Sequence, residues 1–207
     1  MRDFLRQSWL VLACAAFFGL LLAWTYASWE PRIEQNRLMK LRRGIRSILV
    51  DADSIRTDTL AVAEAGAAPL ALYTGYGPGG ELVGYVFRAE GTGFQDRIEL
   101  LVGVGPALER FRGIAVLFAA ETPGFGDAIR DSAIFKCQFV GAPTGQDLFV
   151  VKKPDSERPK TDDPEIVSIT GATITSEAVT TIINRRFDQV QPLLERFITR
   201  RAAPEEG

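Results

Sequence analysis

The chain has 207 residues, of which 24 are basic and 26 acidic, and its formal net charge at pH 7 is −2. This balance does not indicate a nucleic-acid-binding protein, because such proteins usually carry a basic face. Histidine is absent, which excludes Ser–His and Cys–His catalysis and imidazole metal ligands. The two cysteines, Cys14 and Cys137, are far apart in the sequence and form no CxxC pair. We therefore expect any redox chemistry to depend on an organic cofactor or on partner subunits.

An uncharged segment near the N-terminus predicts a transmembrane helix. Residues 9–27 contain no charge, and a helix of this length, rising about 1.5 Å per residue, comes close to the roughly 30 Å thickness of the hydrocarbon core. Aromatic residues that favour the membrane interface lie near both ends: Trp9, Trp24, Tyr26 and Trp29. The alternatives are a cleaved signal peptide and a lipoprotein signal at Cys14. The apolar run is longer than a typical signal h-region, and Cys14 lies in its middle, so we expect the helix to be retained.

The charges that flank this helix leave its orientation open. Arg2 and Arg6 precede it, and a larger basic group follows it: Arg32, Arg37, Lys40, Arg42, Arg43 and Arg46. Charge counting would place the main domain in the cytoplasm, but a long domain can cross the membrane regardless of such charges.

Residues 33–55 are predicted to form a helical stalk. Leu38, Leu41, Ile45 and Ile48 recur at helical spacing and would form one buried stripe. The basic residues lie mostly off that stripe, where they either face solvent or contact lipid headgroups.

The rest of the chain predicts a single α+β domain of short strands and a long C-terminal helix. Apolar runs bounded by turn residues indicate strands at 70–73, 81–87, 98–104, 114–119, 147–151 and 166–169. Residues 174–197 have helical periodicity, with Pro192 able to kink or split the helix. Residues 154–164 are expected to form a loop. We expect a transmembrane segment at 1–29, the stalk at 30–56, the domain at 57–201 and a disordered tail at 202–207.

A run of small and hydroxyl residues, TGATITS at 170–176, lies where a predicted strand meets this helix. Gly171 and Ala172 allow a ligand to approach the backbone closely, and the free amides of a helix start can bind phosphate. Four hydroxyl side chains lie at this point: Thr170, Thr173, Thr175 and Ser176. An ordinary helix N-cap uses the same residue types, so propensity alone does not require a ligand.

This run closely resembles the flavinylation motif (Ser/Thr)-Gly-Ala-Thr-x-(Thr/Ser) of FMN-binding domains. Such domains occur in the G subunit of Rnf-type ferredoxin:NAD oxidoreductases and in the C subunit of sodium-translocating NADH:quinone reductases. In that family a flavin transferase joins FMN through its phosphate to the threonine of Gly-Ala-Thr. The resemblance implies covalent FMN on Thr173, with the rest of the motif around the phosphate: Thr170, Gly171, Ala172, Thr175 and Ser176.

A second motif, ETPGFG at 121–126, has proline and glycine where a type II turn favours them. It also resembles the Glu-Thr-Pro-Gly-Leu-Gly segment that borders the isoalloxazine ring in the same family. The resemblance implies that Glu121 and Thr122 hydrogen-bond the polar edge of the ring. Phe125, next to Gly124 in the turn, would pack on the apolar face of the ring.

Lys152 follows a predicted strand and either corresponds to a lysine near the flavin in this family or faces solvent. Two positions depart from the family pattern. Val167 stands where an acidic residue is usual, three positions before Thr170, so attachment depends on whether the transferase needs that carboxylate. Ala119 and Ala120 replace a His-Lys pair that need not touch the ring.

The resemblance implies a membrane-anchored electron carrier, the redox component of an ion-translocating oxidoreductase. Implied partners are the other membrane and peripheral subunits of an Rnf-type complex, including another flavinylated subunit and iron–sulfur subunits, together with the flavin transferase and the lipid bilayer. The implied location is the bacterial cytoplasmic membrane, crossed once, with the domain on the periplasmic side. The alternatives are a free-standing extracytoplasmic flavoprotein, the C subunit of a sodium-translocating NADH:quinone reductase, and a cofactor-free scaffold.

Overall fold

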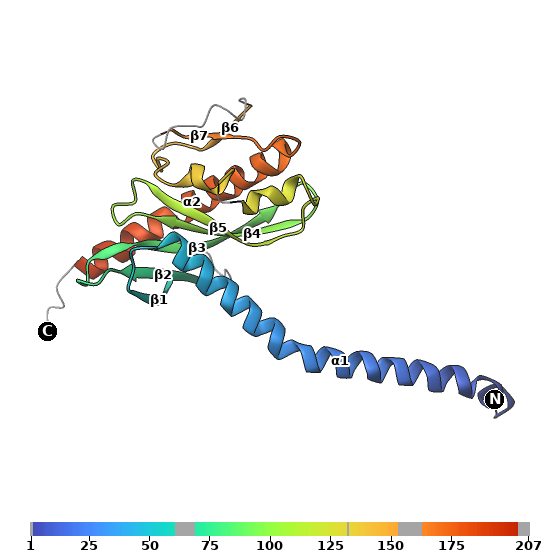
Figure 1. Ribbon diagram of the computed structural model, residues 1–207. Helices are drawn as coiled ribbons and strands as arrows, with labels where there is room; N and C mark the ends of the chain where they lie inside the picture. The colour runs from blue at the N-terminus through green and yellow to red at the C-terminus, as the bar shows by residue number, and fades with distance from the viewer. Residues whose placement is uncertain (1, 61–68, 132, 153–162, 203–207) are drawn as a thin grey trace, which may run out of the picture. The chain divides into compact units, whose positions relative to one another are not determined.

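The computed structural model describes residues 2–60, 69–131, 133–152 and 163–202. The predicted loop at 154–164 and the predicted tail at 202–207 fall almost wholly outside these ranges. The chain divides into two compact units, residues 1–42 and 43–207. The first is the greater part of one helix. The second combines strands with a long helix, which confirms the predicted α+β class (Figure 1).

Helix α1 runs from Arg2 to Ile48 and contains a segment that is long and apolar enough to cross a membrane. Its large apolar side chains are exposed along this segment, with Leu20 at 72% and Leu22 at 71%. Apolar surface of this extent is unfavourable in water. The length and composition of α1 therefore suit a lipid environment, as the uncharged run at 9–27 predicted.

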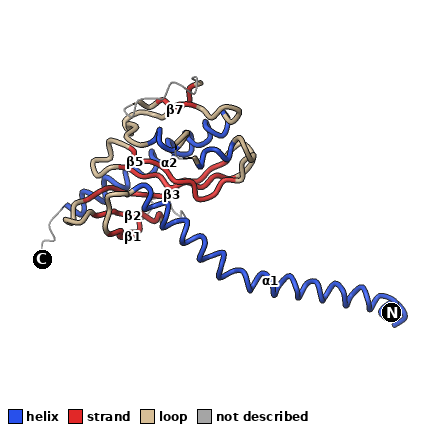
Figure 2. Tube along the Cα trace, viewed as in Figure 1, coloured by secondary structure: helices blue, strands red, loops and turns tan. Residues whose placement is uncertain are grey.

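The main sheet is an antiparallel meander of five strands in the order β1-β2-β3-β4-β5 (Figure 2). The strands are β1 (Ser54–Leu60), β2 (Leu70–Tyr76), β3 (Leu82–Thr92), β4 (Arg97–Val104) and β5 (Phe111–Ala119). Strand β3 is longer than predicted, because Ala89 is buried between the exposed Arg88 and Glu90 and continues the alternation of a half-buried strand. A tight turn from Gly93 to Asp96 then joins β3 to β4.

Helix α2 (Thr173–Ala202) packs on one face of this sheet. Its inward residues, among them Val179, Ile183 and Val190, join Leu100 and Val102 of β4 in one core. Pro192 lies inside α2 and does not split it. A second, parallel pair of strands, β6 (Phe149–Val151) and β7 (Glu165–Val167), lies on the other side of α2 (Figure 1).

The predicted helical stalk was too long, because α1 ends at Ile48 and not at residue 55. Leu49 packs against the bare face of Gly75, where an added Cβ would lie 2.7 Å from its Cδ1 atom. The backbone amide of Asp53 then donates to the carbonyl of Tyr76, and β1 begins one residue later. Strand β1 was missed because it is a mostly exposed edge strand with little apolar signal.

Two short 3-10 helices lie between β5 and β6 and connect the sheet to the site described below. They are η1 (Gly126–Arg130) and η2 (Lys136–Phe139), and both pack on the core through Ile129, Phe135 and Phe139.

Candidate functional site

The TGATITS run forms the loop between β7 and α2 and the first turn of α2. Gly171 has a φ of +80°, a backbone conformation that favours glycine. The Ile169 amide donates to the Ser176 hydroxyl at 3.1 Å, and that hydroxyl donates to the Ala172 carbonyl at 3.0 Å. Ser176 is fully buried. Its hydroxyl therefore ties the loop to the start of α2.

The hydroxyls of this segment differ in their partners. The Thr175 hydroxyl is buried and donates to Glu121 Oε2 at 2.9 Å, and Ser176 is engaged with the loop backbone. Thr173 is the first residue of α2 and is only partly buried. Its hydroxyl makes no hydrogen bond within the described part of the chain. Thr170 is exposed. Of the hydroxyls that follow Gly171 in the motif, the one at Thr173 is thus available to react.

Glu121 connects the second motif with the first. It is 7% exposed, and while Oε2 accepts from Thr175, Oε1 accepts from the Gln95 amide at 3.3 Å. The Gln95 side-chain oxygen accepts from the Thr122 hydroxyl at 3.4 Å. The carboxylate therefore joins the β3–β4 turn, the 121–126 turn and the first turn of α2.

Phe125 lies directly against Gly171. A Cβ added to Gly171 would be 2.7 Å from Phe125 Cδ1, so the aromatic ring packs on bare backbone two residues before Thr173. Phe125 is 53% exposed. Two other apolar side chains of the bordering segments, Phe94 and Ile174, are also exposed. Exposed aromatic groups around a helix start can hold a planar ring by stacking.

Lys152 and Val167 lie at the same end of the small parallel sheet. Val151 is paired with Val167, and the Ser168 amide donates to the Val151 carbonyl at 2.9 Å. Lys152, which is exposed, therefore follows β6 next to the loop that leads into α2. Its role near a cofactor stays a prediction.

The backbone of Val167 is held by a side chain that the sequence did not indicate. Gln138 accepts from the Val167 amide at 2.7 Å and donates to its carbonyl at 3.2 Å. A side-chain amide thus pairs with the free edge of β7. Gln95 was missed as well. It lies in a turn between strands, and no local pattern identifies the partner of a turn amide.

The geometry defines what the site can do. The first amides of a helix have no partner within the helix and are suited to an anionic group such as a phosphate. Thr173 presents a hydroxyl at this point, and Phe125 presents an aromatic surface against Gly171, two residues earlier. Among the described residues, no cluster of His, Cys, Asp or Glu could hold a metal ion. The arrangement suits a phosphorylated organic cofactor with a planar ring.

Comparison with known proteins agrees with this geometry. Residues 93–188 match the family described as FMN-binding domain, and this range contains the β3–β4 turn, both motifs and the start of α2. This part of the chain is therefore similar to FMN-binding domains.

Among known proteins, the chain is similar to three that are named as G subunits of ion-translocating complexes. It is 28% identical to the G subunit of the ion-translocating oxidoreductase complex of Methanosarcina acetivorans, over 87% of this chain and 90% of that protein. It is 36% identical to the G subunit of the Na⁺-translocating ferredoxin:NAD⁺ oxidoreductase complex of Acetobacterium woodii, over 55% of this chain and 52% of that protein. It is 37% identical to the G subunit of the proton-translocating ferredoxin:NAD⁺ oxidoreductase complex of Clostridium ljungdahlii, over 54% and 56%. The match spans about half the length of the last two proteins.

Solved structures support the fold. Shewanella oneidensis NqrC aligns with a TM-score of 0.54 at 20% identity, over 72% of this chain and 73% of that one. The C subunit of the Na⁺-translocating NADH-quinone reductase from Parabacteroides distasonis aligns with a TM-score of 0.51 at 17% identity, over 69% and 78%.

Proposed function

We propose that this chain is a membrane-anchored electron carrier of an ion-translocating ferredoxin:NAD oxidoreductase, with FMN joined through its phosphate to Thr173. The proposal rests on the difference in burial and hydrogen bonding among the hydroxyl groups of the motif. Thr175 and Ser176 are buried and hydrogen-bonded, whereas the partly exposed Thr173 hydroxyl has no partner in the described residues.

The residues around Thr173 fit a phosphate ester. The charge that remains on a phosphodiester oxygen would lie near the unpaired amides at the start of α2, where the helix dipole is also favourable. Gly171 and Ala172 have no bulky side chain to exclude it. Thr170, the first residue of the motif, is exposed. The site therefore offers an attachment point and a means of stabilising the attached charge.

Residues on the neighbouring turns would hold the ring of the cofactor. FMN would supply one- and two-electron redox chemistry, and the protein would supply binding and orientation. Phe125 offers an exposed aromatic surface, and Thr122 and Gln95 offer polar groups. Glu121 already accepts hydrogen bonds with both oxygens, but a carboxylate oxygen has more than one acceptor site. A contact between Glu121 and the ring therefore stays a prediction, as does one from Lys152.

The membrane and partner assignments rest on α1 and on the names of the relatives. We propose that α1 crosses the bacterial cytoplasmic membrane once and that the domain lies on the periplasmic side. The partners would be the other subunits of an Rnf-type complex, including a second flavinylated subunit and iron–sulfur subunits, and a flavin transferase would attach the FMN. Co-purification of several membrane proteins would support this assignment, and a flavinylated monomer would favour a free-standing flavoprotein.

The attachment is tested by the intact mass of the protein purified from its native membrane, with peptide mapping of residues 170–176. We expect added mass equal to FMN less water on the peptide that contains Thr173. Thr173→Ala should abolish this mass and the flavin fluorescence of a denaturing gel. Thr181→Ala, at an exposed position on the same helix, is the matched control and should retain both. Full flavin fluorescence in Thr173→Ala would exclude Thr173 as the attachment site. If the wild-type protein carries no added mass, its visible absorbance would distinguish non-covalently bound flavin from a cofactor-free scaffold.

A further inference from the structure

One buried hydrogen bond joins the two sequence motifs. The Thr175 hydroxyl donates to Glu121 Oε2 at 2.9 Å across a separation of 54 residues. Thr175 is 2% exposed and Glu121 is 7% exposed. A hydrogen bond to a buried carboxylate is stronger than one between neutral groups, and losing either partner leaves the other desolvated.

The Glu121 carboxylate lies in a slot formed by two glycines. A Cβ added to Gly126 would be 2.9 Å from both Glu121 Oε2 and Thr175 Oγ1. A Cβ added to Gly93 would be 2.1 Å from Glu121 Oε1. The carboxylate can therefore reach Thr175 only because both walls lack side chains, and these walls limit its movement.

The second oxygen of Glu121 joins its side chain to the main sheet. Oε1 accepts from the backbone amide of Gln95, in the turn that joins β3 to β4. This turn is itself closed by a 2.7 Å bond from the Gly93 amide to the Asp96 carbonyl. The first turn of α2 is thus held to the β3–β4 hairpin through one side chain.

We propose that Glu121 is a positioning residue that acts through Thr175 to place the Thr173 hydroxyl for flavin attachment. This inference rests on the proposed function, in which Thr173 is the acceptor. Thr173 lies two residues before Thr175, while Ser176 ties the preceding loop from the other side. These two contacts fix the helix start on both sides of the acceptor, whose own hydroxyl is left unbonded among the described residues.

Attachment requires accurate placement of that hydroxyl. With FAD as the donor, a bond forms between Thr173 Oγ and the FMN phosphorus, the pyrophosphate bond breaks, AMP leaves and the hydroxyl proton is released. Misplacement of a reacting group by about 1 Å can slow such a step by about a hundredfold. A looser start of α2 should therefore slow flavinylation even where the fold is intact.

The test measures the initial rate of flavinylation of the full chain in detergent, with flavin transferase and FAD, by intact mass. Thr175→Val keeps the side-chain shape and removes the donor, and we expect a rate at least about tenfold lower. Thr175→Ser keeps the hydroxyl and should retain most of the wild-type rate. Thr180→Val is the matched control. Thr180 is 4% exposed, and its hydroxyl donates to the backbone carbonyl of Glu177 in its own helix. It should react like the wild type.

The thermal unfolding midpoint of each variant is measured as well. A slower rate with a midpoint close to that of the Thr180→Val control indicates lost positioning and not a general loss of structure. The proposal is overturned if Thr175→Val reacts at the wild-type rate, or if Thr180→Val is slowed equally. If Thr175→Val does not fold, Glu121→Gln decides. It weakens the bond from Thr175, because a neutral amide oxygen replaces the carboxylate, and it turns a donor toward the Gln95 amide. An unchanged rate in this variant overturns the proposal. Wild-type protein that accepts no flavin overturns the proposed function as well. A flavinylated wild type with no effect at Thr175 or Glu121 overturns this inference alone.

Discussion

Gly171 is the residue at which backbone conformation and side-chain packing meet. Its φ of +80° is unfavourable for any residue with a Cβ, and that Cβ would also contact the ring of Phe125 at 2.7 Å. Phe125 is half exposed and can move away. A side chain at Gly171 would therefore displace the aromatic ring from its place against the loop that precedes Thr173.

We expect Gly171→Ala to reduce the free energy of unfolding by about 1–2 kcal/mol, from the backbone term, and to slow flavinylation by about tenfold because Phe125 is displaced. Gly80→Ala is the control, since Gly80 has a φ of +81° and no atom within 4 Å of an added Cβ. It should lose similar stability and keep the flavinylation rate. Equal rates in the two variants would show that the packing of Phe125 on Gly171 does not matter for attachment.

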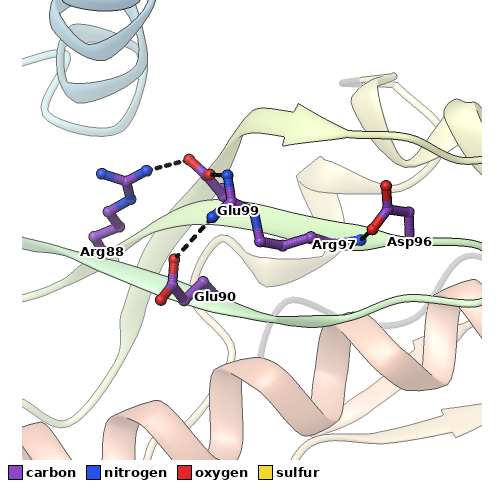
Figure 3. Close-up of polar contacts among 5 residues, drawn as sticks. All are labelled: Arg88, Glu90, Asp96, Arg97 and Glu99. Carbon is purple, nitrogen blue, oxygen red and sulfur yellow. Dashed lines mark hydrogen bonds and ion pairs between the residues drawn. The ribbon is translucent and has the colours of Figure 1, made fainter.

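At the scale of elements, a charged cluster stabilises the β3–β4 hairpin that anchors Glu121. Glu99 on β4 lies opposite Glu90 on β3, an unfavourable pair of like charges. Arg88 and Arg97 both contact the Glu99 carboxylate, and Arg97 also lies 3.9 Å from Glu90 (Figure 3). The Glu99 side chain is 8% exposed, whereas both arginines are about half exposed.

Replacing Glu99 by glutamine should reduce the free energy of unfolding by about 1–2 kcal/mol, because a buried ion-pair partner is lost while both arginines can still be solvated. The measurement is urea denaturation of the full chain in detergent, followed by circular dichroism. Glu90→Gln is the control, since its side chain is 60% exposed and surface charges contribute little. A loss at Glu90 as large as that at Glu99 would contradict the role given to burial.

For the whole molecule, the side of the membrane on which the domain lies is open to a direct test. Charge counting around α1 favours a cytoplasmic domain, whereas the proposed function requires a periplasmic one. Cys137 is exposed on the domain, and Cys14 lies inside the apolar segment of α1. The Cys137 thiol can therefore report on which side of the membrane the domain lies.

We expect a membrane-impermeant maleimide to label Cys137 in intact spheroplasts, because in the proposed orientation the thiol faces the outside. Cys137→Ser should remove the label, and the extent of labelling should not rise when the membrane is permeabilised. Labelling that appears only after permeabilisation would place the domain in the cytoplasm and reverse the proposed orientation.

Features with a local physical cause were predictable from the sequence. The apolar run of α1, the periodicity of α2 and four strands of the main sheet each follow from side-chain pattern and turn residues. Both motifs could be found because each is a short run whose residue types suit a turn or a helix start. The resemblance to FMN-binding domains was found from those two runs, and residues 93–188 match the model of that family.

Only the tertiary structure decided which groups in these motifs are engaged. The sequence placed four hydroxyls together, and the fold buries Thr175 against Glu121 while leaving Thr173 without a partner in the described residues. The edge strand β1, the Gln95 amide and the Gln138 contact were likewise not predictable. Each of them depends on pairing between segments that are far apart in the sequence, and a local pattern carries no information about a distant partner.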